Sequence, residues 1–209
     1  MKKFLEEVRY GGYVITHPFD GFWCLKRENK GSIRTATVFY VVLIAVLVLT
    51  KQCTSFTFNE TNLREFNIFI EILTVIIPVA LWCIAGWSVT TLMDGEGTLK
   101  DIYISLSYAL LPIIVIDLPL ILLSHIISLN EGALYTFFQV AALLWAAMLI
   151  FSGTMTVHHY TPVKTILMII LTVIEMAIIA FLILLFFVLI QQLIDFLYIA
   201  YKELSLRLI

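Results

Sequence analysis

The chain alternates five long apolar runs with short polar segments. An apolar run of about 20 residues is long enough to cross a bilayer as a helix, and the runs cover residues 35–50, 67–93, 102–129, 133–157 and 163–190. The first run is shorter, but Arg34 and Lys51 at its ends can extend their side chains to the membrane surface. The pattern predicts an all-α, polytopic membrane protein with five transmembrane helices.

Two of these runs predict irregular helices. The third contains Pro112 and Pro119, and each proline removes a backbone hydrogen bond, so we expect a kink or a break. The fifth, if continued to Ile194, would be about 48 Å long, whereas the hydrocarbon core is about 30 Å thick. It must therefore tilt, kink or leave the membrane before Gln191.

The two ends of the chain differ in character from the runs between them. Residues 1–34 mix basic and aromatic side chains, which suits a cytoplasmic segment at the membrane interface. Residues 35–194 would form the membrane domain. Residues 195–209 alternate apolar and charged positions and predict an amphipathic tail.

Composition supports the membrane assignment and excludes other classes. Hydrophobic residues make up 61% of the 209 and charged residues 13%, whereas soluble domains have about 25% charged residues. The net charge of −2 gives no reason to expect nucleic-acid binding. The cysteines have neither zinc-site nor disulfide-framework spacing, and no catalytic motif is present. We therefore expect no enzyme activity, no cofactor and no metal.

Basic residues predict the orientation. Nine of the thirteen Lys and Arg residues fall in residues 1–34 and in the two connections that would lie on the same side. The positive-inside rule then places the N-terminus in the cytoplasm and the C-terminus outside.

The connection at residues 94–101 is the most distinctive polar stretch of the chain. Gly95 and Gly97 permit a tight turn with positive φ. Thr98 followed by Asp101 has the pattern of an N-cap and an acidic residue in the first helical turn. We expect a short loop with the next helix beginning near Thr98.

We further expect three segments to pack into one cytoplasmic cap: residues 17–22, 94–101 and 158–164. Phe19, Phe22 and Trp23 covering apolar helix ends would hold it together, because exposed ion pairs contribute only about 0–1 kcal/mol each. Its imidazoles and carboxylates are of types that bind metals, but their spacing defines no metal site. The candidate partner-docking residues are His17, Pro18, Phe19, Asp20, Phe22, Trp23, Asp94, Gly95, Glu96, Gly97, Asp101, His158 and His159.

Two carboxylates lie within apolar runs, Asp117 and Glu175. Ionisable groups in a membrane are costly and are candidates for function. The two side chains would share one polar pocket if their helices were adjacent. Alternatively, Asp117 would bond to backbone carbonyls freed by Pro119, or lie near the outer interface.

Three stretches resemble the Yip (Ypt-interacting protein) domain family of five-span membrane proteins, in particular its bacterial branch. They are the segment His17–Phe22, the loop Asp94–Thr98, and Asp101–Tyr103 leading to Tyr108–Pro112. The resemblance extends from about Tyr10 to Gln191. It implies the five-span fold and the role of an accessory membrane protein, in some bacterial members linked to transport systems.

Eukaryotic members of that family interact with Rab-type GTPases and carry an Asp-Leu-Tyr-Gly-Pro segment before the first span. This chain has His-Pro-Phe-Asp-Gly-Phe near that place, which argues against a Rab-type GTPase as a partner.

Two functions are consistent with these features. The favoured one is a non-enzymatic scaffold of the bacterial cell membrane that docks other membrane proteins, including transporter subunits. The alternative is a small transporter or channel that uses Asp117, Glu175 and the broken third helix. A polar cavity reaching the middle of the membrane would distinguish the second from the first.

Overall fold

All regular secondary structure in the computed structural model is helical within the described residues, which are all except 1, 59–65 and 208–209. The elements in chain order are α1 (Lys2–Thr16), α2 (Pro18–Arg27), α3 (Ile33–Cys53), α4 (Ile68–Leu92), α5 (Leu99–Ala109), α6 (Leu111–Leu123), the 3-10 turn η1 (Leu129–Glu131), α7 (Gly132–His158) and α8 (Pro162–Arg207). Five long apolar helices, with α5 and α6 counted as one, are candidate membrane spans. The all-α membrane class predicted from the sequence is confirmed.

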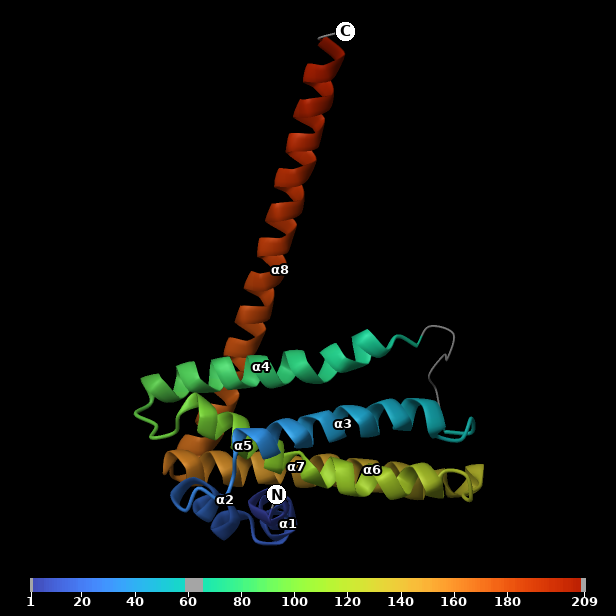
Figure 1. Ribbon diagram of the computed structural model, residues 1–209, viewed down its shortest axis with the longest axis vertical. Coiled ribbons are helices and arrows are strands. Elements are labelled where there is room, and N and C mark those ends of the chain that lie inside the picture. The colour runs from blue at the N-terminus through green and yellow to red at the C-terminus, as the bar shows by residue number, and fades with distance from the viewer. Residues whose placement is uncertain (1, 59–65, 208–209) are drawn as a thin grey trace.

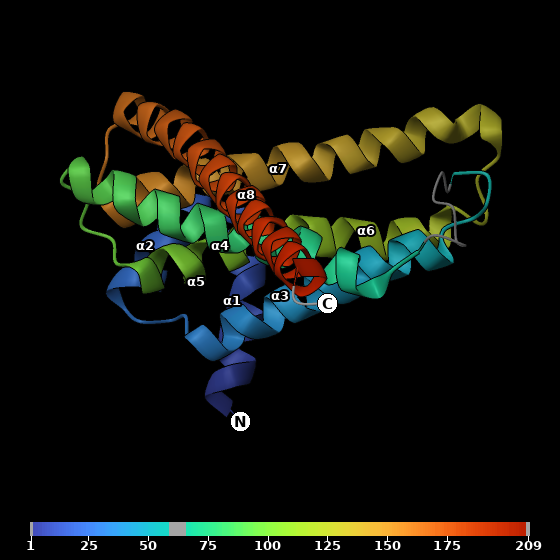
Figure 2. The same ribbon diagram turned by 90° about the horizontal axis from the view of Figure 1, so that it is seen from above.

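Four helices run side by side: α3, α4, α6 and α7 (Figures 1 and 2). α5 leads into α6, and α1 and α2 pack on the side of this bundle opposite α4 (Figure 1). Val14 of α1 and Phe22 of α2 are fully buried in one core with Phe39, Tyr108 and Leu149 of the bundle. The basic N-terminal segment is therefore an integral part of the packed core.

The third span breaks where the sequence predicts. α5 ends at Ala109 and α6 begins at Leu111, with Pro112 in its first turn. Proline has no N–H to donate and is tolerated at the first helical positions, so it ends one helix and starts the next. Pro119 lies inside α6 and does not interrupt it. The break at Pro112 is confirmed, whereas Pro119 is accommodated.

α8 is a single helix of 46 residues, about 69 Å at 1.5 Å per residue. Thr165, Met168 and Thr172 form its buried stripe, where it packs on α4 and α7. Beyond this stripe the helix rises across the bundle and projects from it (Figure 1). It does not kink before Gln191, and residues 195–207 of the expected tail continue it.

The bundle end remote from α2 is closed by polar and aromatic contacts. Lys51 at the end of α3 pairs with Glu71 at the start of α4, with 2.7 Å between Nζ and Oε1. The Ser55 N–H donates to Ser124 Oγ at 3.0 Å, and Phe58 stacks on Tyr135. These contacts connect the first two spans to α6 and α7.

The aromatic residues of α2 do not all contribute to packing as expected. Phe22 is fully buried, but Phe19 and Trp23 are each 47% exposed. Residues 19 and 23 are four apart and share one helix face, which points away from the bundle. The expectation that all three cover apolar helix ends is wrong for Phe19 and Trp23.

Phe22→Ala should lower the free energy of unfolding by about 3–5 kcal/mol, because truncation of a buried phenylalanine leaves a cavity. Trp23→Ala, on the exposed face of the same helix, should change it by no more than about 0.5 kcal/mol. Unfolding in mixed micelles of increasing SDS content, followed by circular dichroism, measures both. An equal loss of unfolding free energy in the two variants would contradict the conclusion that Phe22 holds α2 against the bundle.

Candidate functional site

The loop between α4 and α5 turns at Asp94. Asp94 has φ 55°, a left-handed conformation that Asp tolerates better than most residues. The Gly95 N–H then donates to the carbonyl of Thr90 at 2.8 Å. No described glycine has positive φ, so the expectation that Gly95 and Gly97 make the turn is wrong.

The two glycines are required for a different reason, which is close approach. A Cβ at Gly95 would lie 2.5 Å from the Tyr160 hydroxyl, and one at Gly97 would lie 2.8 Å from His158 Nδ1. Both distances are shorter than van der Waals contact. The absence of side chains at these positions lets the loop lie directly against the α7–α8 connection.

α5 begins with a capping box, as the sequence predicts. The Thr98 N–H donates to Asp101 Oδ2 at 3.0 Å, and the Asp101 N–H donates to Thr98 Oγ1 at 3.3 Å. These reciprocal bonds satisfy two backbone donors that a helix start leaves free. The helix start near Thr98 is confirmed.

His158 links this loop to α7. Its side chain is buried, and its Nδ1 accepts the Gly97 N–H at 3.2 Å. A ring nitrogen that accepts carries no proton, so this geometry assigns a neutral imidazole with the proton on Nε2. The ring also stacks on Tyr160, with 5.4 Å between centroids.

Tyr160 connects the start of α8 to the end of α4. Its hydroxyl lies 3.4 Å from the Met93 carbonyl and 3.5 Å from the Thr90 carbonyl. The Lys164 ammonium lies over its ring at 4.5 Å from the centroid. Burial, and then the charge of Asp94, raise the pKa of Tyr160, so the phenol remains a donor at neutral pH.

A charged cluster covers this loop on the side of α2. Glu96 lies within 4 Å of three partners: Lys26 at 3.9 Å, Arg27 at 3.8 Å and His159 at 3.6 Å. Arg27 also donates to His159 Nε2 at 2.9 Å. Because the Glu96 side chain is 60% exposed, these pairs contribute little to stability. Their charges are available to a partner.

Lys26 has a second role in this cluster. Its ammonium donates to the Val157 carbonyl at 2.6 Å, in the last turn of α7, where a cation is favoured by the helix dipole. Burial lowers the pKa of Lys26, although Asp101 and Glu96 oppose this shift. Lys26 therefore joins α2 to α7 as well as to Glu96.

The structure brings together only part of the predicted cap. Asp94, Gly95, Glu96, Gly97, Asp101, His158 and His159 lie around the loop described above. His17, Pro18, Phe19 and Asp20 lie at the opposite end of α2. There His17 stacks on Tyr13 and bonds to Thr16. It is the C-terminal end of α2, through Lys26 and Arg27, that reaches the loop.

Sequence reasoning missed Glu7, which is buried in α1. Its carboxylate accepts hydrogen bonds from the hydroxyls of Ser32, at 2.6 Å, and Thr35. The Tyr108 hydroxyl donates to its backbone carbonyl at 3.2 Å. The sequence does contain an indication that Glu7 is buried. Glu7, Gly11 and Val14 lie at spacings of four and three and therefore share one face of a helix. That face is the buried one.

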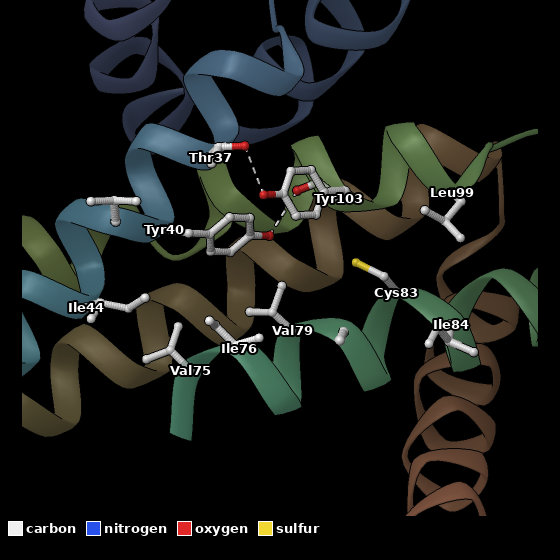
Figure 3. A pocket seen from close by; sticks show the side chains of 12 residues that line it. Thr37, Tyr40, Ile44, Val75, Ile76, Val79, Cys83, Ile84, Leu99 and Tyr103 are labelled. Carbon is white, nitrogen blue, oxygen red and sulfur yellow. Dashed lines mark hydrogen bonds between the residues drawn. The ribbon is translucent and has the colours of Figure 1, made fainter. Parts of the chain in front are cut away.

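A second missed feature is a groove between α3, α4 and α5 with a volume of about 470 Å³ (Figure 3). Aliphatic side chains make up most of its wall. Two polar contacts close it on the α5 side: Thr37 with the Tyr103 hydroxyl at 3.1 Å, and the Tyr40 hydroxyl with the Tyr103 carbonyl at 2.9 Å.

The two intramembrane carboxylates lie in different surroundings. Asp117 is buried on α6, which packs on α3 and α7. Glu175 is half-buried on α8, which packs on α4 and α7. Asp117 has no hydrogen-bond partner among the described residues. Nor do the described residues include a group of three His, Cys, Asp or Glu side chains arranged to hold a metal.

Gly97→Ala should reduce the free energy of unfolding by about 1–3 kcal/mol. The added methyl group would force the loop away from the His158 ring, and His158 Nδ1 would lose its hydrogen bond from the residue 97 N–H. Gly12→Ala is the matched control, since a Cβ at this exposed position of α1 meets nothing within 4 Å. It should stabilise by about 0.5–1 kcal/mol, the helix preference of alanine over glycine. Both are measured by SDS unfolding, and a neutral Gly97→Ala would refute the role of close approach.

Comparison with known proteins identifies the family. A comparison with the curated proteins and with the solved structures returned no match. A family model, the Yip1 domain, matches residues 12–189. The match begins in α1, includes the loop and the capping box of α5, and ends in α8, so it covers every contact described for the site except those of Glu7. The chain belongs to the Yip1 domain family.

Proposed function

We propose that this protein is a non-enzymatic membrane scaffold that docks another membrane-spanning protein along α8. The Yip1 family consists generally of non-enzymatic membrane proteins. The observation that carries the proposal is the exposed apolar stretch of α8 from Phe181 to Ile194. Every residue from Phe181 to Ile199 is exposed, and no charged residue occurs between Glu175 and Asp195.

The direction of α8 supports a protein partner over lipid alone. The axes of α3, α4, α6 and α7 are roughly aligned, and the axis of α8 crosses them (Figure 1). Because α8 leaves the bundle at a steep angle, its side chains beyond Thr172 have little contact with the other candidate spans. It is also apolar on all sides, unlike an interfacial helix, which needs a polar face. Spans of a second protein beside the bundle would cover it.

The charged end of the bundle offers a second contact. Arg27 and Glu96 are exposed around the α4–α5 loop, and Lys26, Lys100 and Lys164 lie on the segments that meet there. We place it in the cytoplasm on the positive-inside rule. A partner with complementary charges there would be oriented by them, while α8 supplies apolar contact area.

The sequence before the first span supports a class of partner. The His17–Phe22 segment stands where Rab-binding relatives carry another motif, which supports the bacterial branch and the bacterial cell membrane as location. It favours membrane proteins such as transporter subunits as partners. The exposure of Phe19 and Asp20 leaves this segment available for such contacts.

A photo-crosslinking residue at Leu184 should form an adduct with one discrete membrane protein in intact cells, because this position lies on the proposed docking helix. The same residue at Ile77, exposed on α4, is the control and should react with lipid alone. Adducts are separated by electrophoresis and identified by mass spectrometry.

Lipid adducts alone at both positions would contradict the proposal. So would an adduct at twice the mass of the chain, since a second copy would then cover α8.

One observation favours the alternative of a small transporter, namely that Asp117 is buried without a described partner. Ionisable groups of this kind mark proton relays in transporters. However, α6 and α8, which carry Asp117 and Glu175, do not pack closely on each other, although both contact α7. The wall of the groove between α3, α4 and α5 is mainly aliphatic. The geometry therefore supports docking better than transport.

Protein reconstituted in vesicles that contain a pH-sensitive dye should show proton flux no greater than protein-free vesicles. The scaffold proposal includes no conducting path, so Asp117→Asn should change nothing in this assay. Flux in the wild type that Asp117→Asn removes and Glu175→Gln retains would overturn the scaffold and establish Asp117 as part of a transport path.

A further inference from the structure

The groove between α3, α4 and α5 has the properties of a binding site. Its volume of about 470 Å³ lies within the range of small-molecule sites, about 300–1,000 Å³. It opens sideways between α3 and α4, two candidate membrane spans, and Val41, Ile76 and Ile84 on its rim are exposed. An opening framed by exposed aliphatic side chains of two spans faces the hydrocarbon of the bilayer.

The interior of the groove suits an apolar occupant. Val75 and Val79 of α4 face Ile44 of α3 across it (Figure 3), and Ala80 of α4 also lines it. The tyrosine and threonine hydroxyls on its α5 side already bond to one another or to backbone. A polar ligand or a chain of waters would find few free partners, and unpaired polar groups in such a place are costly. An acyl chain requires none.

Two basic side chains lie at the end of the groove where α3 and α5 begin. Arg34 precedes Thr37 by three residues and Val41 by seven, so it shares the groove face of α3. Lys100 follows Leu99, which lines the groove, and precedes Tyr103 by three residues. Both are exposed, and neither makes an ion pair or a side-chain hydrogen bond with any described residue.

We propose that this groove binds one acyl chain of an anionic glycerophospholipid, with the lipid phosphate beside Arg34 and Lys100. An apolar channel that ends at two unpaired cations has the charge pattern of such a lipid, and basic pockets between spans recognise anionic headgroups. The bound chain fills the space between α3 and α4. This inference does not depend on whether α8 docks a partner.

The test is native mass spectrometry of the purified protein titrated with phosphatidylglycerol or phosphatidylcholine of identical acyl chains. One phosphatidylglycerol should bind more tightly than phosphatidylcholine. Arg34→Gln and Lys100→Gln should each weaken phosphatidylglycerol binding about fivefold and leave phosphatidylcholine binding unchanged. Arg9→Gln, at an exposed position on α1, is the control and should have no effect. Equal affinities for the two lipids in the wild type would overturn the headgroup assignment.

Ala80→Trp fills the groove and should abolish tight binding of both lipids. Ala147→Trp, at an exposed alanine of α7 that does not line the groove, should retain it. If Ala80→Trp fails to fold, the wild type still decides the question through a phosphatidylglycerol with a photoreactive group on its acyl chain. Labelling should concentrate on residues 37–44 and 75–84. Labelling spread evenly over the exposed faces of α7 and α8 would overturn the proposal.

Discussion

The arrangement of the spans depends on the contact between the α4–α5 loop and the α7–α8 connection. Here the Gly97 N–H reaches His158, and the Tyr160 hydroxyl reaches the carbonyls at the end of α4. Four helices end or begin within this contact. Backbone groups buried at helix ends must find partners, so the loop, the imidazole and the phenol hold the ends of α4, α5, α7 and α8 in one relative position.

A second buried polar contact joins the N-terminal helices to the spans. The Glu7 carboxylate would be expensive to bury alone, but the Ser32 and Thr35 hydroxyls bond to it. Removing one hydroxyl from such a contact costs more than the contact contributes, because a buried acceptor is left with a hydrogen bond unmade. With Phe22 in the core, this contact makes α1 and α2 a structural layer of the domain, and the outer faces of both helices are exposed.

Apart from these two contacts, the domain has two lateral surfaces that differ in shape and in charge. The groove between α3 and α4 is concave and ends beside Arg34 and Lys100, whereas α8 from Phe181 to Ile194 is convex, exposed and without charged residues. A concave apolar surface suits a flexible chain, and an apolar helix suits packing against other helices. One domain can thus hold a lipid and a protein partner on separate faces, without a reaction centre.

The amino-acid sequence was enough to predict the membrane class, the five apolar spans, the break at Pro112 and the capping box at Thr98. Each of these follows from local hydropathy or from residues a few positions apart. Tertiary packing was needed to show that Asp94 makes the turn, that Phe22 is buried while Trp23 is exposed, and that Glu7 lies in the core. It was also needed to show that Asp117 and Glu175 lie on helices that do not pack closely on each other, and that a groove opens beside Tyr103. These features depend on which helix faces pair across the bundle, and in a mostly apolar chain nearly every face is equally suited to lipid and to protein.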